Sequence, residues 1–138
     1  MISVIIPVYN EEECLLKNDV YYQMISQTGE LIFVDGGSTD RTVSLAKKLG
    51  RVITAPKNRG AQMNRGAKEA KHKILLFLHA DAFIHLENLQ QIVKAIEERN
   101  CIGGCFKQVL DDPAPLYRWI AWTGNIRARY RRFTTAIR

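Results

Sequence analysis

Short apolar runs alternate along the chain with segments whose apolar residues recur every three or four positions. The runs are rich in β-branched residues and end at proline or polar residues, which is typical of buried strands. They cover residues 2–7, 31–34, 52–54 and 74–78. The segments between them have the period of amphipathic helices. This order predicts an α/β fold built from βαβ units, with a mostly parallel sheet and helices on both faces.

The helical segments carry start and stop signals. Asn10 followed by Glu13 resembles a capping box, and Leu16, Val20 and Met24 then recur at helical spacing before Gly29. Further helices are expected from a cap at Ser38, Thr39 or Asp40 through Leu49, from Asn58 to Ala70, from Leu86 to Ile96 and from Leu116 to about Tyr130, with another strand from Cys105 to Leu110.

Polar loops follow the first, second and fourth expected strands. They are Tyr9–Glu12, Asp35–Asp40 and His79–Ala82. Ligands of open parallel sheets bind outside the carboxyl ends of the strands, so these three loops are expected to meet at one edge of the sheet. The sequence therefore predicts a polar binding site there.

The loop after the second strand and the helix at Asn58 suit a nucleotide. Asp35 can accept hydrogen bonds from a base or ribose, although an aspartate there also forms turns. Gly36 and Gly37 let backbone approach a ligand, or simply make a tight turn. Arg59 at a helix N-terminus suits a phosphate, the alternative being a solvated surface arginine.

The loop after the fourth strand suits a divalent metal. A carboxylate at such a strand end can hold Mg²⁺ or Mn²⁺, which in turn bridges a diphosphate. Asp81 is the favoured ligand. His79 lies on the same side of an extended chain as Asp81, and a hydrogen-bonded structural histidine is the reading we prefer over metal ligation.

Charge divides the 138 residues into two parts. Residues 113–138 contain six arginines and no Asp, Glu or Lys, whereas residues 1–112 contain 14 basic and 14 acidic residues. We expect a binding domain over 1–112 and a basic, tryptophan-containing helix over 113–138 that packs against a further part of the protein. The alternative is a patch for nucleic acid or an anionic membrane. No nucleic acid partner is expected, and peripheral membrane contact stays open.

Several protein classes are disfavoured. The three cysteines are too few for a disulfide framework, and the C-x3-C spacing of Cys101 and Cys105 has no second ligand pair for zinc. No apolar run approaches 18 residues and no signal peptide is read, so we expect a cytoplasmic protein, with or without contact with the inner face of the membrane. The G-x-G-x-x-G, P-loop, G-x-S-x-G and H-E-x-x-H patterns are absent.

Four segments in order resemble the family-2 glycosyltransferases of GT-A type. They are residues 5–12 (IIPVYNEE), 33–42 (FVDGGSTDRT), 58–67 (NRGAQMNRGA) and 76–82 (LFLHADA). The match is closest to a compact bacterial subset with His-Ala-Asp in place of the family's Asp-x-Asp motif. The resemblance implies a GT-A, Rossmann-like fold, incomplete in this chain.

The resemblance also implies roles for particular residues. Pro7, Tyr9 and Glu11 or Glu12 would border the base and ribose. The nucleotide loop would comprise Asp35, Gly37 and Ser38, with Asp35 on the nucleoside and Arg59 near the base or diphosphate. The metal motif would be His79, Ala80 and Asp81, with Asp81 holding Mg²⁺ or Mn²⁺. The reaction implied is inverting transfer from a nucleotide-diphosphate-sugar donor to an acceptor, which the sequence does not identify.

The family supplies an acidic general base from a later segment, and no Asp or Glu follows Asp112 here. The base is therefore expected beyond Arg138, the chain is expected to be truncated, and transfer at a normal family rate is not expected. Apolar residues around Trp119 and Trp122 would then favour self-association. The alternatives are a nucleotide-binding module without transfer activity and a nucleotidyltransferase.

Overall fold

The structure is a computed structural model that describes residues 1–99, 102–106, 122–123, 125–126 and 135–137. The chain divides into two compact units, Met1–Leu89 and Gln90–Arg138. The first unit contains a four-stranded, wholly parallel sheet in the order β3-β2-β1-β4. Its strands are β1 (Ile2–Val8), β2 (Glu30–Asp35), β3 (Arg51–Thr54) and β4 (Ile74–Phe77). The predicted α/β class and parallel sheet are confirmed.

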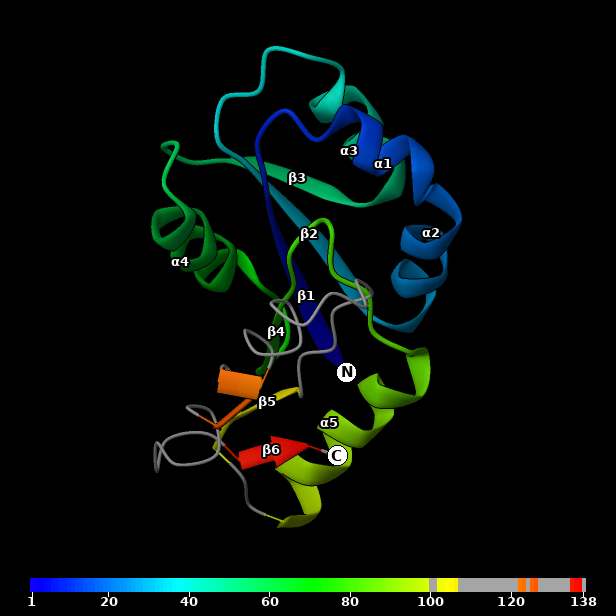
Figure 1. The fold of residues 1–138 in the computed structure, drawn as a ribbon, viewed down its shortest axis with the longest axis vertical. Coiled ribbons are helices and arrows are strands. Elements are labelled where there is room, and N and C mark those ends of the chain that lie inside the picture. Colours follow the sequence, from blue (N-terminus) through cyan, green and yellow to red (C-terminus); the bar gives the residue numbers. More distant parts are fainter. Residues whose placement is uncertain (100–101, 107–121, 124, 127–134, 138) are drawn as a thin grey trace. The chain divides into compact units, whose positions relative to one another are not determined.

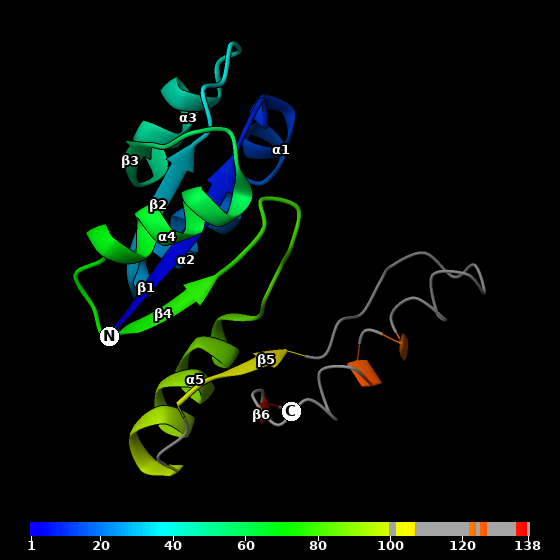
Figure 2. The same cartoon turned by 90° about the vertical axis from the view of Figure 1, so that its left-hand side faces the viewer.

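Helices cover both faces of this sheet (Figure 1). They are α1 (Glu12–Lys17), α2 (Asp19–Thr28), α3 (Thr42–Leu49) and α4 (Arg59–Glu69). Helix α4 packs on β1 and β2 from one side, and α2 and α3 pack from the other, with α1 against α3 (Figure 2). Gly66 lets α4 approach closely, because a Cβ at this position would collide with Ile5 and would lie 3.0 Å from Val34.

The strand order creates a switch point between β1 and β4. The chain runs outward from β1 through β2 to β3, and then returns to place β4 on the other side of β1. Pairing of β1 with β4 ends where the Leu78 amide donates to the Ile5 carbonyl oxygen (3.0 Å). Pro7, the next residue of β1 on that side, has no N–H to offer. The loops after β1 and β4 therefore separate at the carboxyl edge, where open parallel sheets bind ligands.

The expected helix after β1 is two helices, because the chain breaks at Asn18. Leu16, Val20 and Met24 are exposed, whereas the residues that α1 and α2 bury are Leu15, Tyr22 and Ile25. Leu15, Tyr22 and Ile25 lie seven and ten positions apart, which is also helical spacing, so the period was right but the buried face is the neighbouring one.

Two expected helix caps are also wrong. Helix α1 begins at Glu12 without a side-chain cap, and Asn10 instead adopts a φ of 53°. Helix α3 begins at Thr42 after Arg41, although Asp40 does accept a hydrogen bond from the Thr42 amide (2.9 Å). At α4, the predicted cap is confirmed, since the Asn58 side chain accepts from the Ala61 amide (3.0 Å).

Strand β4 is less buried than its apolar sequence predicts. Leu75 and Leu76 are half-buried and Phe77 is exposed, whereas every residue of β1 is buried. The cause is position in the sheet: within the described part of the chain, β4 pairs only with β1, while β1 has a strand on each side.

Beyond the first unit, α5 (Leu86–Arg99) begins before the division between the units and ends after it, and β5 (Gly104–Phe106) pairs in parallel with β6 (Thr135–Ile137). The predicted strand over 105–110 is described only to Phe106. Of the predicted helix over 116–130, residues 122–123 and 125–126 are helical and the rest lie outside the described residues. All six arginines of 113–138 lie outside them too.

In the part that is described, no helix combines the length and apolarity needed to cross a membrane.

Candidate functional site

The loops after β1 and β2 are tied to each other by reciprocal hydrogen bonds. The Asn10 amide donates to Ser38 Oγ (2.9 Å), and the Thr39 amide donates to Asn10 Oδ1 (2.9 Å). The Glu11 amide donates to Thr42 Oγ1 (2.8 Å) at the start of α3. The left-handed backbone of Asn10, which asparagine adopts more readily than most residues, directs both of its groups to the second loop. The two predicted loops therefore form one platform.

Glu12 belongs to this structural link. Its carboxylate accepts from the Arg41 amide (2.9 Å) and from Arg41 Nε (2.8 Å), and it forms an ion pair with the same guanidinium. The hydrogen bonds from Arg41 lower the pKa of Glu12. Of the two glutamates that the sequence offered for the nucleoside, Glu12 is thus engaged in holding the loops together, which leaves Glu11.

Glu11 lies within electrostatic reach of groups from two other loops. Burial is the first cause that raises the pKa of Glu11, followed by repulsion from Asp81, while Arg59 opposes the shift. Glu11 follows β1, Arg59 opens α4 and Asp81 follows β4. The loops after β1 and β4, which the sequence predicts to meet at the carboxyl edge, thus influence each other's charges, and so does the start of α4.

Asp35 builds the loop that follows β2. Asp35 is 2% exposed, and its carboxylate accepts hydrogen bonds from the Gly37 amide (2.9 Å), the Ser38 amide (3.1 Å) and Ser38 Oγ (2.5 Å). Gly37 has a φ of 91°, which a residue with a side chain rarely adopts. Asp35 therefore forms the turn, which was one of its two expected roles. Its contact with a nucleoside stays a prediction.

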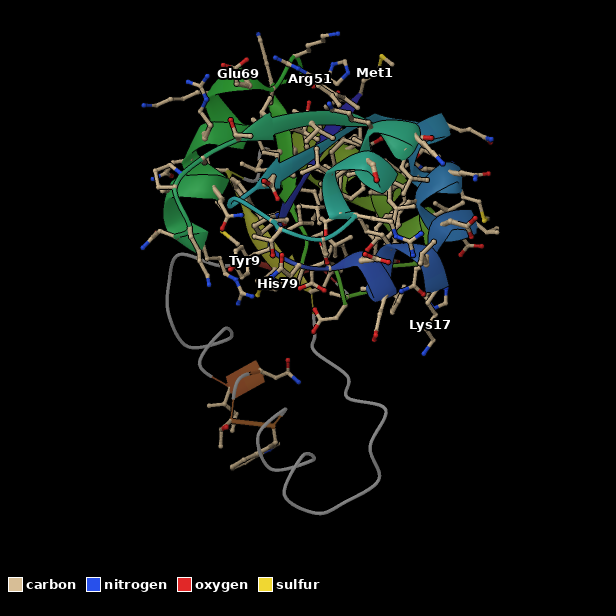
Figure 3. All side chains as sticks on the ribbon, turned by 90° about the horizontal axis from the view of Figure 1, so that it is seen from above. Met1, Tyr9, Lys17, Arg51, Glu69 and His79 are labelled. Atoms are coloured by element: carbon tan, nitrogen blue, oxygen red, sulfur yellow. The ribbon has the colours of Figure 1, made fainter. Side chains whose placement is uncertain are left out.

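Tyr9 and His79 lie at the same edge of the unit, away from Met1, Arg51 and Glu69 (Figure 3). The Lys57 ammonium lies 3.6 Å from the centroid of the Tyr9 ring, a cation–π arrangement. Lys57 was not singled out from the sequence, and the only available signal was its place just before the Asn58 cap. It adds a second cation beside Arg59 on the β3–α4 connection.

Gln62 is a site-shaping residue that the sequence did not reveal. It is 4% exposed in the first turn of α4, and its side-chain amide donates to the carbonyl oxygens of Val8 (2.9 Å) and Val34 (2.7 Å). These carbonyls stand at the ends of β1 and β2, directly before the two loops. The sequence did carry one signal of this role: Gln62 is a polar residue on a helix face that otherwise carries the small residues Gly66 and Ala70.

The turn at residues 79–82 presents Asp81 to solvent. The Ala82 amide donates to the His79 carbonyl oxygen (3.1 Å), Ala80 is buried, and Asp81 is exposed. Within the described residues, no three His, Cys, Asp or Glu side chains are placed to hold a metal ion. Mg²⁺ commonly takes only one or two carboxylates and completes its shell with phosphate and water oxygens. Asp81, with Glu11 in reach, fits that pattern when a diphosphate is present.

A family model described as Glycosyl transferase family 2 matches residues 3–136. The chain belongs to this family. It is 33% identical over 101 residues to an uncharacterized glycosyltransferase of Haemophilus influenzae, across 66% of this chain and 40% of that protein. The fold matches S. aureus TarS 1–349 in complex with UDP (TM-score 0.65, 28% identity, 83% of this chain and 38% of that one).

The GT-A-like fold recurs in glucosyl-3-phosphoglycerate synthase from Mycobacterium tuberculosis, solved with Mn²⁺, UDP and glucosyl-3-phosphoglycerate. That likeness has a TM-score of 0.57 and 24% identity, over 70% of this chain and 39% of the synthase. This chain thus spans about two fifths of the length of the proteins named here.

Proposed function

We propose that the chain binds a nucleotide-diphosphate sugar at the carboxyl edge of its sheet, as the donor-binding part of a metal-dependent, inverting glycosyltransferase. The observation that carries the proposal is the platform that the hydrogen-bonded loops after β1 and β2 form at the carboxyl edge, where the Lys57 ammonium lies 3.6 Å from the centroid of the Tyr9 ring. Lys57 and Arg59, just before and at the start of α4, suit a diphosphate, and the carboxylates of Glu11 and Asp81 suit a divalent ion. The UDP complex of the TarS fragment supports a uridine nucleotide as the first probe.

Each group has a role in this proposal. Arg59 and the free amides at the start of α4 would bind diphosphate oxygens, because the helix dipole and the guanidinium both favour anions there. Pro7, Tyr9 and Glu11 would border the base and ribose, and Asp35, Gly37 and Ser38 would keep the nucleotide loop in shape. Asp81 would hold Mg²⁺ or Mn²⁺; when bound, the ion supplies positive charge that neutralises the departing nucleoside diphosphate.

The transfer itself needs an acceptor hydroxyl and a base. Attack on the anomeric carbon from the face opposite the diphosphate forms the new glycosidic bond as the bond to the diphosphate breaks, which inverts the configuration. The hydroxyl proton passes to a base.

Calorimetry of UDP binding, with and without MnCl₂, tests the proposal. Wild-type protein should bind UDP more tightly with Mn²⁺, and Asp81→Asn should lose that difference while keeping its affinity for UDP alone. Asp19→Asn is a matched control, because Asp19 is an exposed carboxylate at the start of α2. Equal affinity of the wild type with and without Mn²⁺ would refute the metal site.

Three wider expectations are kept as proposals. We expect the protein to be cytoplasmic and to self-associate, while peripheral contact of its arginine-rich segment with the inner face of the membrane stays the alternative to packing against a further part of the protein. Fractionation of cells tests the first, light scattering of the purified chain tests the second, and salt-dependent retention on anionic vesicles tests the third.

A further inference from the structure

The buried carbonyl oxygen of Ala80 is held by two side chains from the helices that follow β1. Cys14 Sγ in α1 donates to it (3.0 Å), and the Tyr22 hydroxyl in α2 donates to it as well (2.5 Å). Ala80 is 4% exposed and Tyr22 is fully buried. A carbonyl oxygen has two lone pairs, so these two donors use its full capacity. Neither donor belongs to the sheet that carries the loop.

We propose that Cys14 and Tyr22 are positioning residues that set the place of Asp81 through the Ala80 carbonyl oxygen. This inference rests on the proposed function of Asp81. The residue after Ala80 is exposed and lies in a turn closed by a single backbone bond, from the Ala82 amide to the His79 carbonyl oxygen. Because Cys14 and Tyr22 fix the Ala80 carbonyl oxygen, the backbone next to Asp81 is held in place. The Asp81 carboxylate is therefore kept at the carboxyl edge of the sheet.

A second tie holds the far end of the same loop. The Ile84 amide donates to the Tyr21 hydroxyl (2.9 Å), and that hydroxyl lies 3.3 Å from the Ile84 carbonyl oxygen. The Phe83 ring meets the Tyr21 ring edge-on, with centroids 5.0 Å apart. This tie is three residues from Asp81, whereas the Ala80 tie is adjacent. Tyr21 therefore anchors the loop at Ile84, and Tyr22 anchors it at Ala80, next to the proposed metal ligand Asp81.

The donors are suited to a permanent role. The Tyr22 ring packs edge-on against Phe33 of β2, with centroids 5.5 Å apart, which fixes the hydroxyl in the core. The Asn18 side-chain amide lies 3.6 Å from Cys14 Sγ and bonds the Cys14 carbonyl oxygen (2.9 Å). Burial is the main cause that raises the pKa of both the Cys14 thiol and the Tyr22 hydroxyl, so both keep the proton that they donate.

The test compares Tyr22→Phe, which removes only the hydroxyl, with Ile25→Val as a matched control. Ile25 is a fully buried residue of the same helix with no bond to the loop, and its truncation costs stability of the same order. For each protein, the ratio of UDP affinities with and without Mn²⁺ is measured by calorimetry. Tyr22→Phe should reduce this ratio about fivefold, the worth of one hydrogen bond. Its affinity for UDP alone should stay within about twofold of the wild type, a change smaller than the worth of one hydrogen bond.

Hydrogen exchange of the free protein supplies a reading that does not involve metal or nucleotide. The Ala82 amide should exchange faster in Tyr22→Phe but not in Ile25→Val, while the Ile84 amide, still tied to Tyr21, should not change. Unchanged exchange at Ala82 together with an unchanged affinity ratio would overturn the proposal. If the wild type shows no Mn²⁺ effect, the proposed metal function fails, and exchange at Ala82 alone decides the positioning role. Cys14→Ala gives the same two readings should Tyr22→Phe not fold.

Discussion

Replacing Gln62 by Met should destabilise the protein, although methionine suits a buried position of a helix. Methionine keeps the length and helix propensity of glutamine but has no donor. The change removes hydrogen bonds to the carbonyl oxygens of Val8 and Val34, at the ends of two buried strands. The Val8 oxygen keeps a bond from the Gly36 amide (2.9 Å), so the cost per bond should be near the usual value. Two bonds at about 1 kcal/mol each give a loss of about 2 kcal/mol.

Thermal unfolding measures this loss. For a chain of this length, about 2 kcal/mol lowers Tm by about 6–10 °C. Asn64→Met is a suitable control, because Asn64 is exposed on the same helix and has no comparable role. Hydrogen exchange of Gly36 should also quicken, because the ends of β1 and β2 lose the link between them. A Tm for Gln62→Met within about 1 °C of the control, a difference below a single hydrogen bond, would refute the reasoning.

Two further changes test the platform and the packing beneath it. Glu12→Gln should lower Tm at pH 7, and this difference should shrink as pH falls below 4.5 and through the folded pKa. The lowered pKa of Glu12 gives stability that is fully present above the unfolded value of 4.5 and is lost as pH falls through the folded value. A pH-independent difference would contradict this. Gly66→Ala should cost about 1–3 kcal/mol, because the new methyl collides with Ile5 and pushes α4 outward. Gly60→Ala, whose Cβ would meet only the Asn58 side-chain oxygen at 3.3 Å, should not destabilise, and equal Tm values for the two alanine variants would count against this packing.

The sequence predicted the order of elements and the edge at which the site lies, because both follow from hydrophobic pattern and chain connectivity. Buried strands such as β1 and β2 are continuous apolar runs, and parallel connections place the ends of those strands together. The Asn58 cap was also predictable, since capping depends on residues a few positions apart. The expected approach of the loops that carry Glu11 and Asp81 followed from the same rules of connectivity.

Features that depend on tertiary contacts were not predictable in the same way. A helical period says which residues share a face but not whether that face is buried, so Leu16, Val20 and Met24 gave no sign that they are exposed. Tyr22 can be buried because its hydroxyl has a hydrogen-bond acceptor in the Ala80 carbonyl oxygen, 58 positions away in the sequence. Likewise, Glu12 is committed to Arg41 only because two loops lie side by side.

Paramagnetic broadening by Mn²⁺ tests the central claim most directly, because it reports where the ion binds. In a ¹H–¹⁵N spectrum of the chain with UDP, a small amount of Mn²⁺ should broaden the amide signals of residues 9–12, 59–61 and 80–82 first. Signals at the opposite edge of the sheet, such as Arg51 and Lys71, should stay sharp, and Asp81→Asn should abolish the broadening. Broadening centred on that opposite edge, or equal broadening in Asp81→Asn, would contradict a nucleotide–metal site at the switch point.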